Sequence, residues 1–290
     1  MSVVFVTGSN GQLGSEIRKL AAFYPQFSFR FTDIDELSIT DEVAVRTEFE
    51  KWLPEYCINC AAYTAVDRAE TDIDTCRLIN ATAVQYLAKA SIDYGSKLLH
   101  VSTDYVYDGT KNSAYIETDA TNPQSTYGLT KLEGEELAMA YNPETLIIRT
   151  SWVYSSFGNN FVKTMMRLMK ERDNLNVVGD QVGSPTYAKD LADAIIQIIV
   201  KSKVSVENWQ PGIYHFSNEA EVSWFDFAVA IKEEIGSSCA VNPIPTSAYP
   251  TPAKRPMYSL MDKSKFVATF QIPLQPWKNS LQACINLLPQ

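Results

Sequence analysis

Tyr127 and Lys131 are the residues whose types and spacing most directly suggest chemistry. They are four positions apart at the start of a stretch, residues 127–137, whose composition predicts a helix, and positions i and i+4 share one helix face. A lysine ammonium beside a phenol favours the ionised phenol and lowers its pKa from about 10 toward working pH. The pair could therefore act as a general acid or base. Such pairs are also common on surface helices, so the interpretation depends on the features around them.

Two hydroxyl side chains precede this pair. Ser102 and Thr103 directly follow an apolar run, residues 98–101, that predicts a strand. Hydroxyls at the carboxyl end of a strand lie at the edge where α/β sheets bind ligands. Both hydroxyls could therefore contact a bound ligand.

A glycine pattern follows the first predicted strand, residues 3–6, and leads into a predicted helix over residues 15–23. Gly8 permits a tight turn, Gly11 lets the backbone approach a pyrophosphate, and Gly14 allows close packing of helix and strand. The helix N-terminus would present free N–H groups to the phosphates. A GxxGxxG pattern between a strand and a helix predicts a dinucleotide site.

The choice between NADH and NADPH stays open. Asp33 follows the second predicted strand, residues 27–31, and lies 19 residues beyond Gly14, close to the spacing of an acid that binds a ribose 2′-hydroxyl. That spacing favours NADH. Arg30 could instead meet a 2′-phosphate, Asp35 is a rival acid, and Asp33 could simply begin a loop.

Strands alternate with helices through about residue 155, which predicts an α/β fold with a Rossmann-like doubly wound parallel sheet. We expect residues 1–155, with a return segment near 177–200, to form an NAD(P)-binding domain. Residues 156–176 and 201–290 would form a smaller C-terminal α/β substrate-binding lobe. Within it, the proline-rich stretch 243–256 predicts a fixed loop that could hold Lys254 and Arg255 over an anionic ligand.

Composition limits the classes of function. With 46% hydrophobic and 20% charged residues, the chain is typical of soluble globular proteins. A net charge of −9 argues against nucleic-acid binding. The five cysteines show no disulfide framework, and we interpret Cys57 and Cys60 as small core residues rather than a redox pair. No signal peptide or membrane span is apparent, so we expect a cytoplasmic protein with no membrane partner.

Eight sequence stretches between residues 7 and 256 resemble the extended short-chain dehydrogenase/reductase superfamily and, more closely, its dTDP-4-dehydrorhamnose reductase family. They are TGSNGQLG, AAYTAVDRAE, STDYVYDG, YGLTKLEGE, RTSWVY, GNNFVKTM, DQVGSPT and PTSAYPTPAKRP. The resemblance implies reduction of the C4 keto group of dTDP-4-dehydro-β-L-rhamnose by NADPH or NADH, the last step of dTDP-rhamnose synthesis. The nucleotide sugar would be the partner molecule.

The resemblance also implies roles for individual residues. Tyr127 would protonate the C4 oxygen, Lys131 would hold the nicotinamide ribose and lower the Tyr127 pKa, and Thr103 would polarise the carbonyl. The sugar would contact Thr103, Asp104, Tyr105 and Trp152, and we add Arg255 for the diphosphate. The cofactor would lie on Gly8, Asn10, Gly11, Gln12, Leu13, Gly14, Asp33, Ser38, Ile39, Ala61, Ala62, Tyr63, Tyr127 and Lys131.

A metal site and the oligomeric state stay open. Some members of that family hold Mg²⁺ between acidic residues at a dimer contact. Glu16 is suitably placed for this, but the second position has Lys189 beside Asp190, so we assign no metal ligands. Whether the chain forms a homodimer is likewise left open.

Two alternative functions share these motifs. A nucleotide-sugar epimerase or 4,6-dehydratase has the same glycines and YxxxK, but a dehydratase needs an acidic base where Tyr105 stands. Related folds also serve as non-catalytic regulatory subunits of methionine adenosyltransferase, because a fold does not determine a function. The intact Thr103, Tyr127 and Lys131 favour catalysis.

Overall fold

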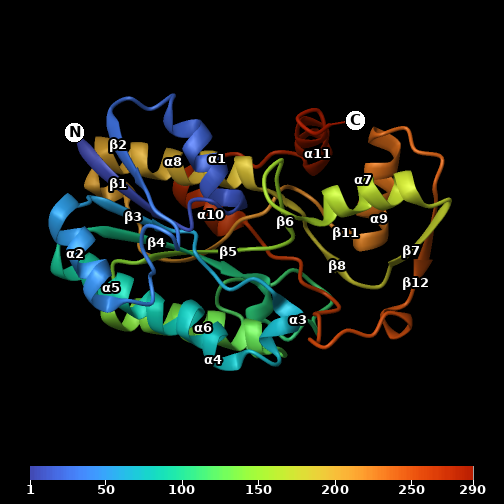
Figure 1. Cartoon of the computed structure of the whole chain (residues 1–290), viewed down its shortest axis with the longest axis horizontal. Helices are drawn as coiled ribbons and strands as arrows, with labels where there is room; N and C mark the ends of the chain where they lie inside the picture. Colours follow the sequence, from blue (N-terminus) through green and yellow to red (C-terminus); the bar gives the residue numbers. More distant parts are fainter. Residues whose placement is uncertain (290) are drawn as a thin grey trace.

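The computed structural model describes residues 1–289 and is built around one six-stranded parallel sheet (Figure 1). The strand order is β10-β5-β4-β3-β1-β2. The chain winds outward from β1 in both directions, so the order reverses between β1 and β3, where α/β sheets open a ligand crevice. This confirms the expected Rossmann-like fold. The strands are β1 (Ser2–Thr7), β2 (Phe27–Phe31), β3 (Tyr56–Asn59), β4 (Lys97–Thr103), β5 (Leu146–Thr150) and β10 (Gly212–His215).

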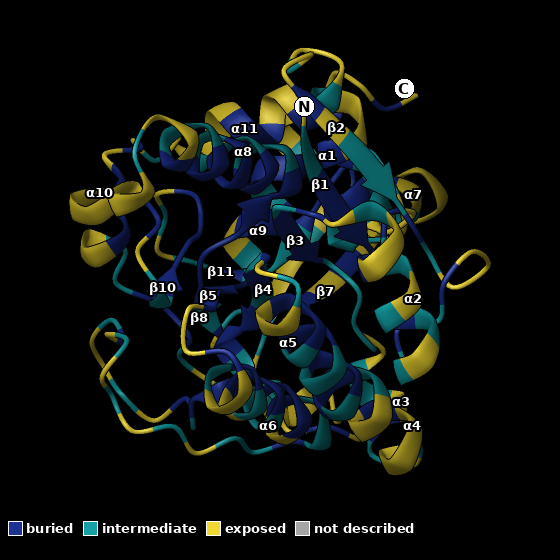
Figure 2. Ribbon diagram, turned by 90° about the vertical axis from the view of Figure 1, so that its left-hand side faces the viewer, coloured by how far each residue is buried: buried dark blue, intermediate teal, exposed yellow. Residues whose placement is uncertain are grey.

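Helices cover both faces of the sheet. One apolar cluster joins α1, α8 and α10 to one face, where Val4 and Val6 point. A second joins α2, α5 and α6 to the opposite face, where Phe5 points. Because both faces are covered, the central strands are almost wholly buried (Figure 2). The helices are α1 (Gln12–Ala21), α2 (Glu42–Trp52), α5 (Ala83–Asp93), α6 (Thr126–Tyr141), α8 (Ala188–Val204) and α10 (Ser264–Phe270).

Short helical segments connect β3 to α5. They are α3 (Val66–Ala69), α4 (Ile73–Arg77) and a π-helical turn, η1 (Leu78–Thr82), which continues directly into α5. A β-carbon on Gly134 of α6 would lie 2.1 Å from the Asn80 carbonyl oxygen of η1. Glycine therefore lets α6 pack directly against this turn, and α6 is the helix that carries Tyr127 and Lys131.

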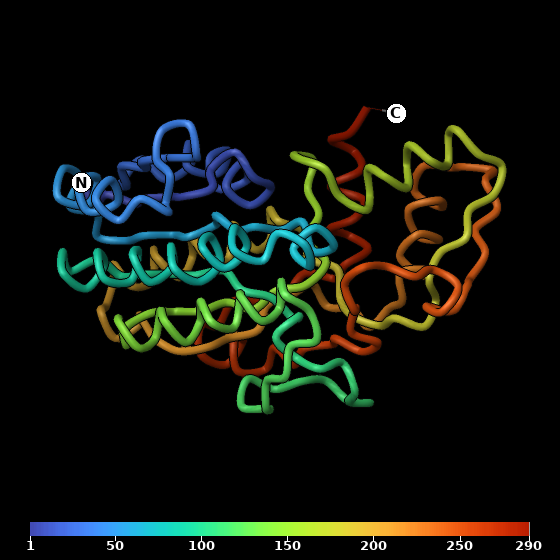
Figure 3. The backbone as a smooth tube through the Cα atoms, turned by 60° about the horizontal axis from the view of Figure 1, so that its bottom comes forward, coloured from blue at the N-terminus to red at the C-terminus, as the bar shows by residue number. Residues whose placement is uncertain are grey.

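A smaller lobe lies beyond the sheet, on the right in Figure 3. It has its own apolar core, in which the methionines of α7 pack against α9 and α11. Three two-stranded sheets pair β7 with β12, β8 with β11, and β6 with β9. The elements are β6 (Val153–Tyr154), α7 (Phe161–Glu171), β7 (Asn174–Val178), β8 (Val182–Gly183), β9 (Thr186–Tyr187), β11 (Val222–Ser223), α9 (Trp224–Glu234), β12 (Ala240–Ile244) and α11 (Trp277–Ile285).

The chain crosses between the two lobes differently from our expectation. We placed residues 177–200 with the sheet and 201–290 with the small lobe. Instead, β7 pairs with β12 in the small lobe, whereas β10 pairs with β5 and α10 packs on β10. The return segment therefore starts at about β9 and extends through β10. The physical reason is that Tyr214 of β10 and Phe270 of α10 pack together in the apolar core that covers the sheet.

Smaller differences concern element ends. The first helix begins at Gln12 rather than at residue 15. Pro243 lies in β12, a strand with one partner, where a missing N–H is tolerated, so the fixed loop starts after Ile244. Within residues 1–289, no helix is both long and apolar enough to cross a membrane.

Candidate active site

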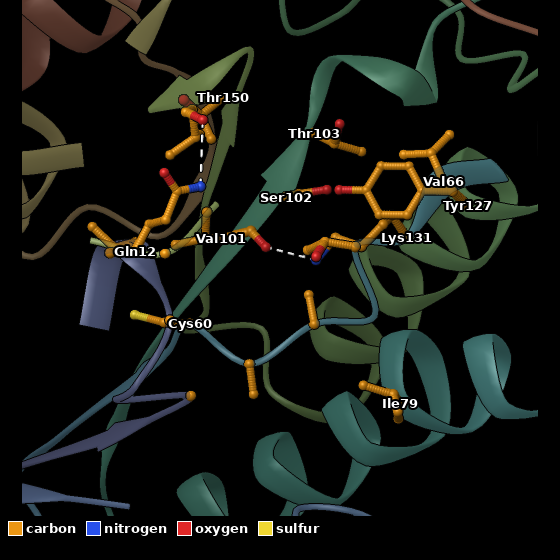
Figure 4. Close-up of a pocket in the computed structure, with 18 of the residues that line it drawn as sticks. Gln12, Cys60, Val66, Ile79, Val101, Ser102, Thr103, Tyr127, Lys131 and Thr150 are labelled. Carbon is orange, nitrogen blue, oxygen red and sulfur yellow. Dashed lines mark hydrogen bonds between the residues drawn. The ribbon is translucent and has the colours of Figure 1, made fainter. Parts of the chain in front are cut away.

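A cavity of about 1200 Å³ opens at the carboxyl ends of β1, β3, β4 and β5. Its walls come from the sheet on one side and from Phe161, Trp224 and Arg255 on the other. Figure 4 shows Tyr127 and Lys131, both from α6, beside the strand that carries Val101, Ser102 and Thr103. This volume exceeds that of most drug-sized pockets and can accommodate two ligands side by side.

The glycine loop forms one end of the cavity. Gly8 has φ +63°, and a β-carbon there would lie 2.5 Å from the Ala61 backbone nitrogen. A β-carbon on Gly14 would lie 2.5 Å from the Gly8 carbonyl oxygen. Gly8, Gly11, Gln12 and Leu13 line the cavity, as expected. Gly14 does not line the cavity, because it packs against the backbone of the glycine loop.

Asp33 stands beside this loop and lines the cavity. Its Oδ2 accepts a 2.7 Å hydrogen bond from the backbone N–H of Asn10, whose own side chain does not line the cavity. Asp33 thus couples the end of β2 to the glycine loop. Arg30 is not in the cavity wall, since its guanidinium lies over the Trp52 ring at 4.8 Å. Our alternative use of Arg30 for a 2′-phosphate gains no support from this position and stays a prediction.

Arg18 is a cation beside the loop that our sequence analysis missed. Its Nη2 donates to the Ser9 hydroxyl at 2.6 Å and to the Asn10 side-chain oxygen at 3.3 Å. The sequence could have indicated this position, because Arg18 lies four residues, or one helical turn, beyond Gly14 and therefore on the same face of the helix.

The middle of the cavity is lined as expected by Ser38, Ile39, Ala61 and Ala62. Tyr63 is the exception. Its hydroxyl donates to Asp72 at 3.0 Å, and Asn80 holds its backbone through bonds of 2.8 and 3.1 Å. Tyr63 therefore fixes the course of the chain after β3 and does not line the cavity. Cys60 does line it, and the part of the chain described here contains only free cysteines.

Tyr127 and Lys131 occupy the first two turns of α6. The Ser125 hydroxyl caps this helix by accepting from the Gly128 N–H at 3.2 Å. A β-carbon on Gly128 would lie 2.3 Å from the Tyr105 carbonyl, so the helix start packs directly on the turn after β4. The Tyr105 and Tyr127 rings meet edge to face at 5.4 Å. These contacts hold the phenol at the cavity wall.

The ionisation of this pair differs from the expectation. Burial raises the pKa of Tyr127, although its hydrogen bond with Thr103 acts in the opposite direction. Lys131 Nζ donates to the Val101 carbonyl at 2.7 Å, and burial lowers its pKa to about 8. The ammonium thus points toward β4 and does not produce a phenolate. Tyr127 rests as a phenol, which is the form that a proton donor needs.

Asp104 is the second perturbed acid. It directly follows β4, and burial raises its pKa to about 6, against the lowering effect of the Ser259 and Thr103 hydroxyls. Thr103 donates to the Asp104 carboxylate at 3.1 Å and accepts from the Tyr105 N–H at 3.2 Å. To donate to a ligand carbonyl, the Thr103 hydroxyl must therefore rotate away from Asp104.

Aromatic side chains form the wall from the small lobe. Trp152 has φ +48°, an uncommon conformation for a bulky residue, and its ring stacks on Trp224 at 3.7 Å. Arg255 also lines the cavity, and two of its guanidinium nitrogens bind the Asp67 carboxylate at 3.0 and 2.8 Å. Its remaining N–H donors can reach a second anion. Lys254 bonds Gln124 at the surface instead.

Comparison with known proteins now decides the family. A family model described as "RmlD substrate binding domain" matches residues 1–289. The chain is 44% identical to dTDP-4-dehydrorhamnose reductase of Aggregatibacter actinomycetemcomitans, over 97% of this chain and 98% of that protein. This chain belongs to the RmlD family.

Solved structures of RmlD-family proteins agree with this membership. A dTDP-4-dehydrorhamnose reductase from Clostridium acetobutylicum superposes with a TM-score of 0.93 at 41% identity, covering 98% of this chain and 99% of that one. One from Bacillus anthracis, solved in complex with NADP, also gives 0.93, at 36% identity, covering 99% and 100%. The expected resemblance is therefore confirmed.

The RmlD-family member described here does not offer a good Mg²⁺ site. Glu16 is buried, accepts from the Ser155 hydroxyl at 2.6 Å, and has its pKa raised by burial. Asp190 is already bonded to Asn218 at 2.7 Å and to Ser280. No group of three or more potential ligands occurs within residues 1–289. These residues do not fit the oxygen-rich shell that Mg²⁺ prefers, so we derive no step through a metal.

Proposed function

We propose that this chain reduces the C4 keto group of dTDP-4-dehydro-β-L-rhamnose to dTDP-L-rhamnose with NADPH or NADH. The observation that carries this proposal is the joint placement of Thr103, Tyr127 and Lys131 with the glycine loop in one cavity. Relatives matched over nearly the whole chain bear the name of this reductase, and one was solved with NADP.

In this proposal the sheet side of the cavity would hold the cofactor, which would supply the hydride. The N-terminus of α1 would bind the pyrophosphate, and the small Ala61 and Ala62 would leave room beside the chain after β3. Asp33 would accept a ribose hydroxyl, while Arg18 would add positive charge close by. Both nucleotides would therefore be accepted, with Asp33 disfavouring and Arg18 favouring the additional phosphate of NADPH.

The protein's chemical task is to stabilise the negative charge that develops on the C4 oxygen. Tyr127 rests as a phenol and transfers its proton to that oxygen. The Thr103 hydroxyl, once rotated from Asp104, donates a hydrogen bond to the same oxygen. Thr103 is buried and Tyr127 is half-buried, and the lower polarity around them strengthens both interactions.

The small-lobe side of the cavity would bind the nucleotide sugar. The stacked Trp152 and Trp224 present a flat apolar surface to the sugar, and Asp104 and Tyr105 contact its hydroxyls. Arg255, preoriented by Asp67, would bind the diphosphate. A local cation of this kind lets a chain of net charge −9 accept an anionic substrate.

The direct test is oxidation of NADPH and NADH by the purified chain with enzymatically generated dTDP-4-dehydro-L-rhamnose. We expect rapid turnover that requires the keto sugar, and dTDP-L-rhamnose as the product. Protein that binds cofactor but oxidises neither nucleotide with this sugar would contradict the proposal. Tightly retained NAD with epimerisation would then favour an epimerase, and capture of a methionine adenosyltransferase would favour a regulatory subunit.

A further inference from the structure

Four buried side chains form a hydrogen-bonded chain beneath the reacting end of the cavity. Thr7 Oγ1 donates to Asn59 Oδ1 at 2.7 Å, Asn59 Nδ2 lies 3.0 Å from His100 Nδ1, and His100 Nε2 lies 3.3 Å from Lys131 Nζ. The residues come from β1, β3, β4 and α6, and each is almost inaccessible to solvent. His100 is the member of this chain to which no role has been assigned above.

The directions of these hydrogen bonds follow from one contact. The backbone N–H of Ala61 donates to Asn59 Oδ1 at 3.1 Å, and an N–H can face only an acceptor. The amide of Asn59 is thereby oriented, with its Nδ2 donating to His100 Nδ1. Since Nδ1 accepts, the neutral imidazole of His100 must carry its proton on Nε2, which faces Lys131.

This tautomer matters for Lys131. An ammonium has three protons and no lone pair, so it cannot accept the Nε2–H of His100. A neutral amine can accept that N–H and still donate to the Val101 carbonyl, which lies 2.7 Å away. The contact with His100 therefore penalises the charged form of Lys131.

We propose that His100, held as its Nε2–H tautomer by Asn59, is a positioning residue that disfavours the ammonium form of Lys131 and thereby makes Lys131 a stronger proton donor. This inference rests on the proposed function. After Tyr127 has given its proton to the substrate oxygen, the proposal has Lys131, one helical turn further along α6, supply the proton that restores the phenol. The resulting amine accepts the His100 Nε2–H and then regains a proton from water.

Other titratable groups around Lys131 also act on its pKa. Glu135, one turn along α6, raises the lysine pKa, as do Cys76 from α4 and Cys60 after β3. Burial outweighs them and lowers the pKa of Lys131 to about 8. Burial also lowers the pKa of His100 well below its usual value, and the charge on Lys131 acts in the same direction. The imidazole therefore stays neutral, as the proposal requires.

The first measurement locates the ring proton without any substrate. The chain has two histidines, so a protein labelled with ¹⁵N-histidine shows only two ring systems. One-bond coupling to hydrogen identifies the protonated nitrogen of each, and the His215→Gln variant assigns them. We expect a proton on Nε2 of His100. A proton on Nδ1 would overturn the proposal, whether or not any variant below folds.

The second measurement uses two variants with different chemistry. In Asn59→Asp the carboxylate accepts from Nδ1–H, so Nε2 becomes an acceptor for the Lys131 ammonium. In His100→Leu the Nε2–H is removed without any added charge. Reduction needs protonated Lys131, so kcat/KM should fall as pH rises through about 8 in the wild type. This alkaline limb should move upward by about one pH unit in Asn59→Asp and by less in His100→Leu.

An alkaline limb that stays in place in both variants would overturn the proposal, because a merely structural role would lower activity equally at every pH. Titration of ¹⁵N-lysine-labelled protein gives the Lys131 ionisation directly. If the wild type reduces no keto sugar, the proposed function fails, but the ring proton and the lysine titration still decide the role of His100.

Discussion

The two walls of the cavity are built differently. The sheet wall is held in place by backbone contacts: Gly8 is pressed against Ala61, and the buried Lys131 is bonded to the Val101 carbonyl, as Figure 4 shows for the second contact. The small-lobe wall consists of half-buried side chains, such as Trp152 stacked on Trp224. The first wall has little freedom to adjust, whereas the second can shift by rotation of side chains. Proton transfer needs the fixed geometry of the first wall, and sugar recognition tolerates the second.

Replacement of Tyr127 by Phe tests the sheet wall most severely. Removal of the proton donor should reduce kcat by about 10²–10⁴-fold while leaving cofactor affinity nearly unchanged. Steady-state assays and cofactor titration measure the two quantities. Tyr141→Phe, at the exposed end of the same helix, is the matched control and should retain full activity. Comparable activity of both variants would remove Tyr127 from the mechanism.

Replacement of Gly8 by Ala tests whether backbone contact really limits this wall. The new β-carbon would meet the Ala61 backbone at 2.5 Å in addition to the strain of φ +63°. Gly95→Ala is the control, since it has φ +67° but nothing within 4 Å. Strain alone should cost about 1 kcal/mol at Gly95, whereas Gly8→Ala should lose more than about 3 kcal/mol together with cofactor binding. Equal losses in denaturant unfolding would show that the contact is unimportant.

Replacement of Asp104 by Asn probes the boundary between the walls through pH. Because burial raises the folded pKa to about 6, the folded state binds more protons than the unfolded state, and Asp104 costs stability as pH rises from about 4 to about 6. Asp104→Asn should therefore be more stable than the wild type by about 3 kcal/mol at pH 8. The two proteins should match near pH 4. Unfolding curves at both pH values test the sign, and a variant that is less stable at pH 8 would refute it.

Replacement of Trp152 by Ala should have the smallest effect. Loss of the stacked surface costs about 1 kcal/mol of sugar binding, which corresponds to a rise in KM of about fivefold. The KM for NADPH should not change, and Trp152→Phe should restore most of the affinity because one ring can still stack on Trp224. A large fall in kcat instead would show that the small-lobe wall is as rigid as the sheet wall.

Local patterns in the sequence predicted the sheet wall well. The glycine pattern and the YxxxK spacing each depend on residues within a few positions of one another, and the structure has the corresponding loop and helices. Of the predicted cofactor residues, Asn10, Gly14 and Tyr63 do not line the cavity. These three residues instead hold the backbone next to the cavity. Residue type alone does not tell a residue that lines a cavity from one that supports its wall.

Contacts between distant segments could not be predicted in this way. The bond between Asn59 and His100 spans 41 positions, and the β10 strand pairs with β5 across more than sixty residues. The Asp67 carboxylate meets Arg255 across 188 positions. Such pairs depend on the packed fold, since hydrogen bonding alone does not specify which distant partner a polar side chain will meet. The tautomer of His100 belongs to this class.

The edge position of β10 has a consequence for synthesis of the protein. When residue 155 leaves the ribosome, β5 still lacks its outer neighbour, and α8 and α10 have not yet been made. A further 115 residues must be translated before α10 ends at Phe270, which takes roughly 6–23 s at usual rates. During that interval the β5 edge is unpaired, and the part of one face that α8 and α10 later cover is exposed. We therefore expect the nascent chain to be more prone to association than the finished protein, in which both are covered.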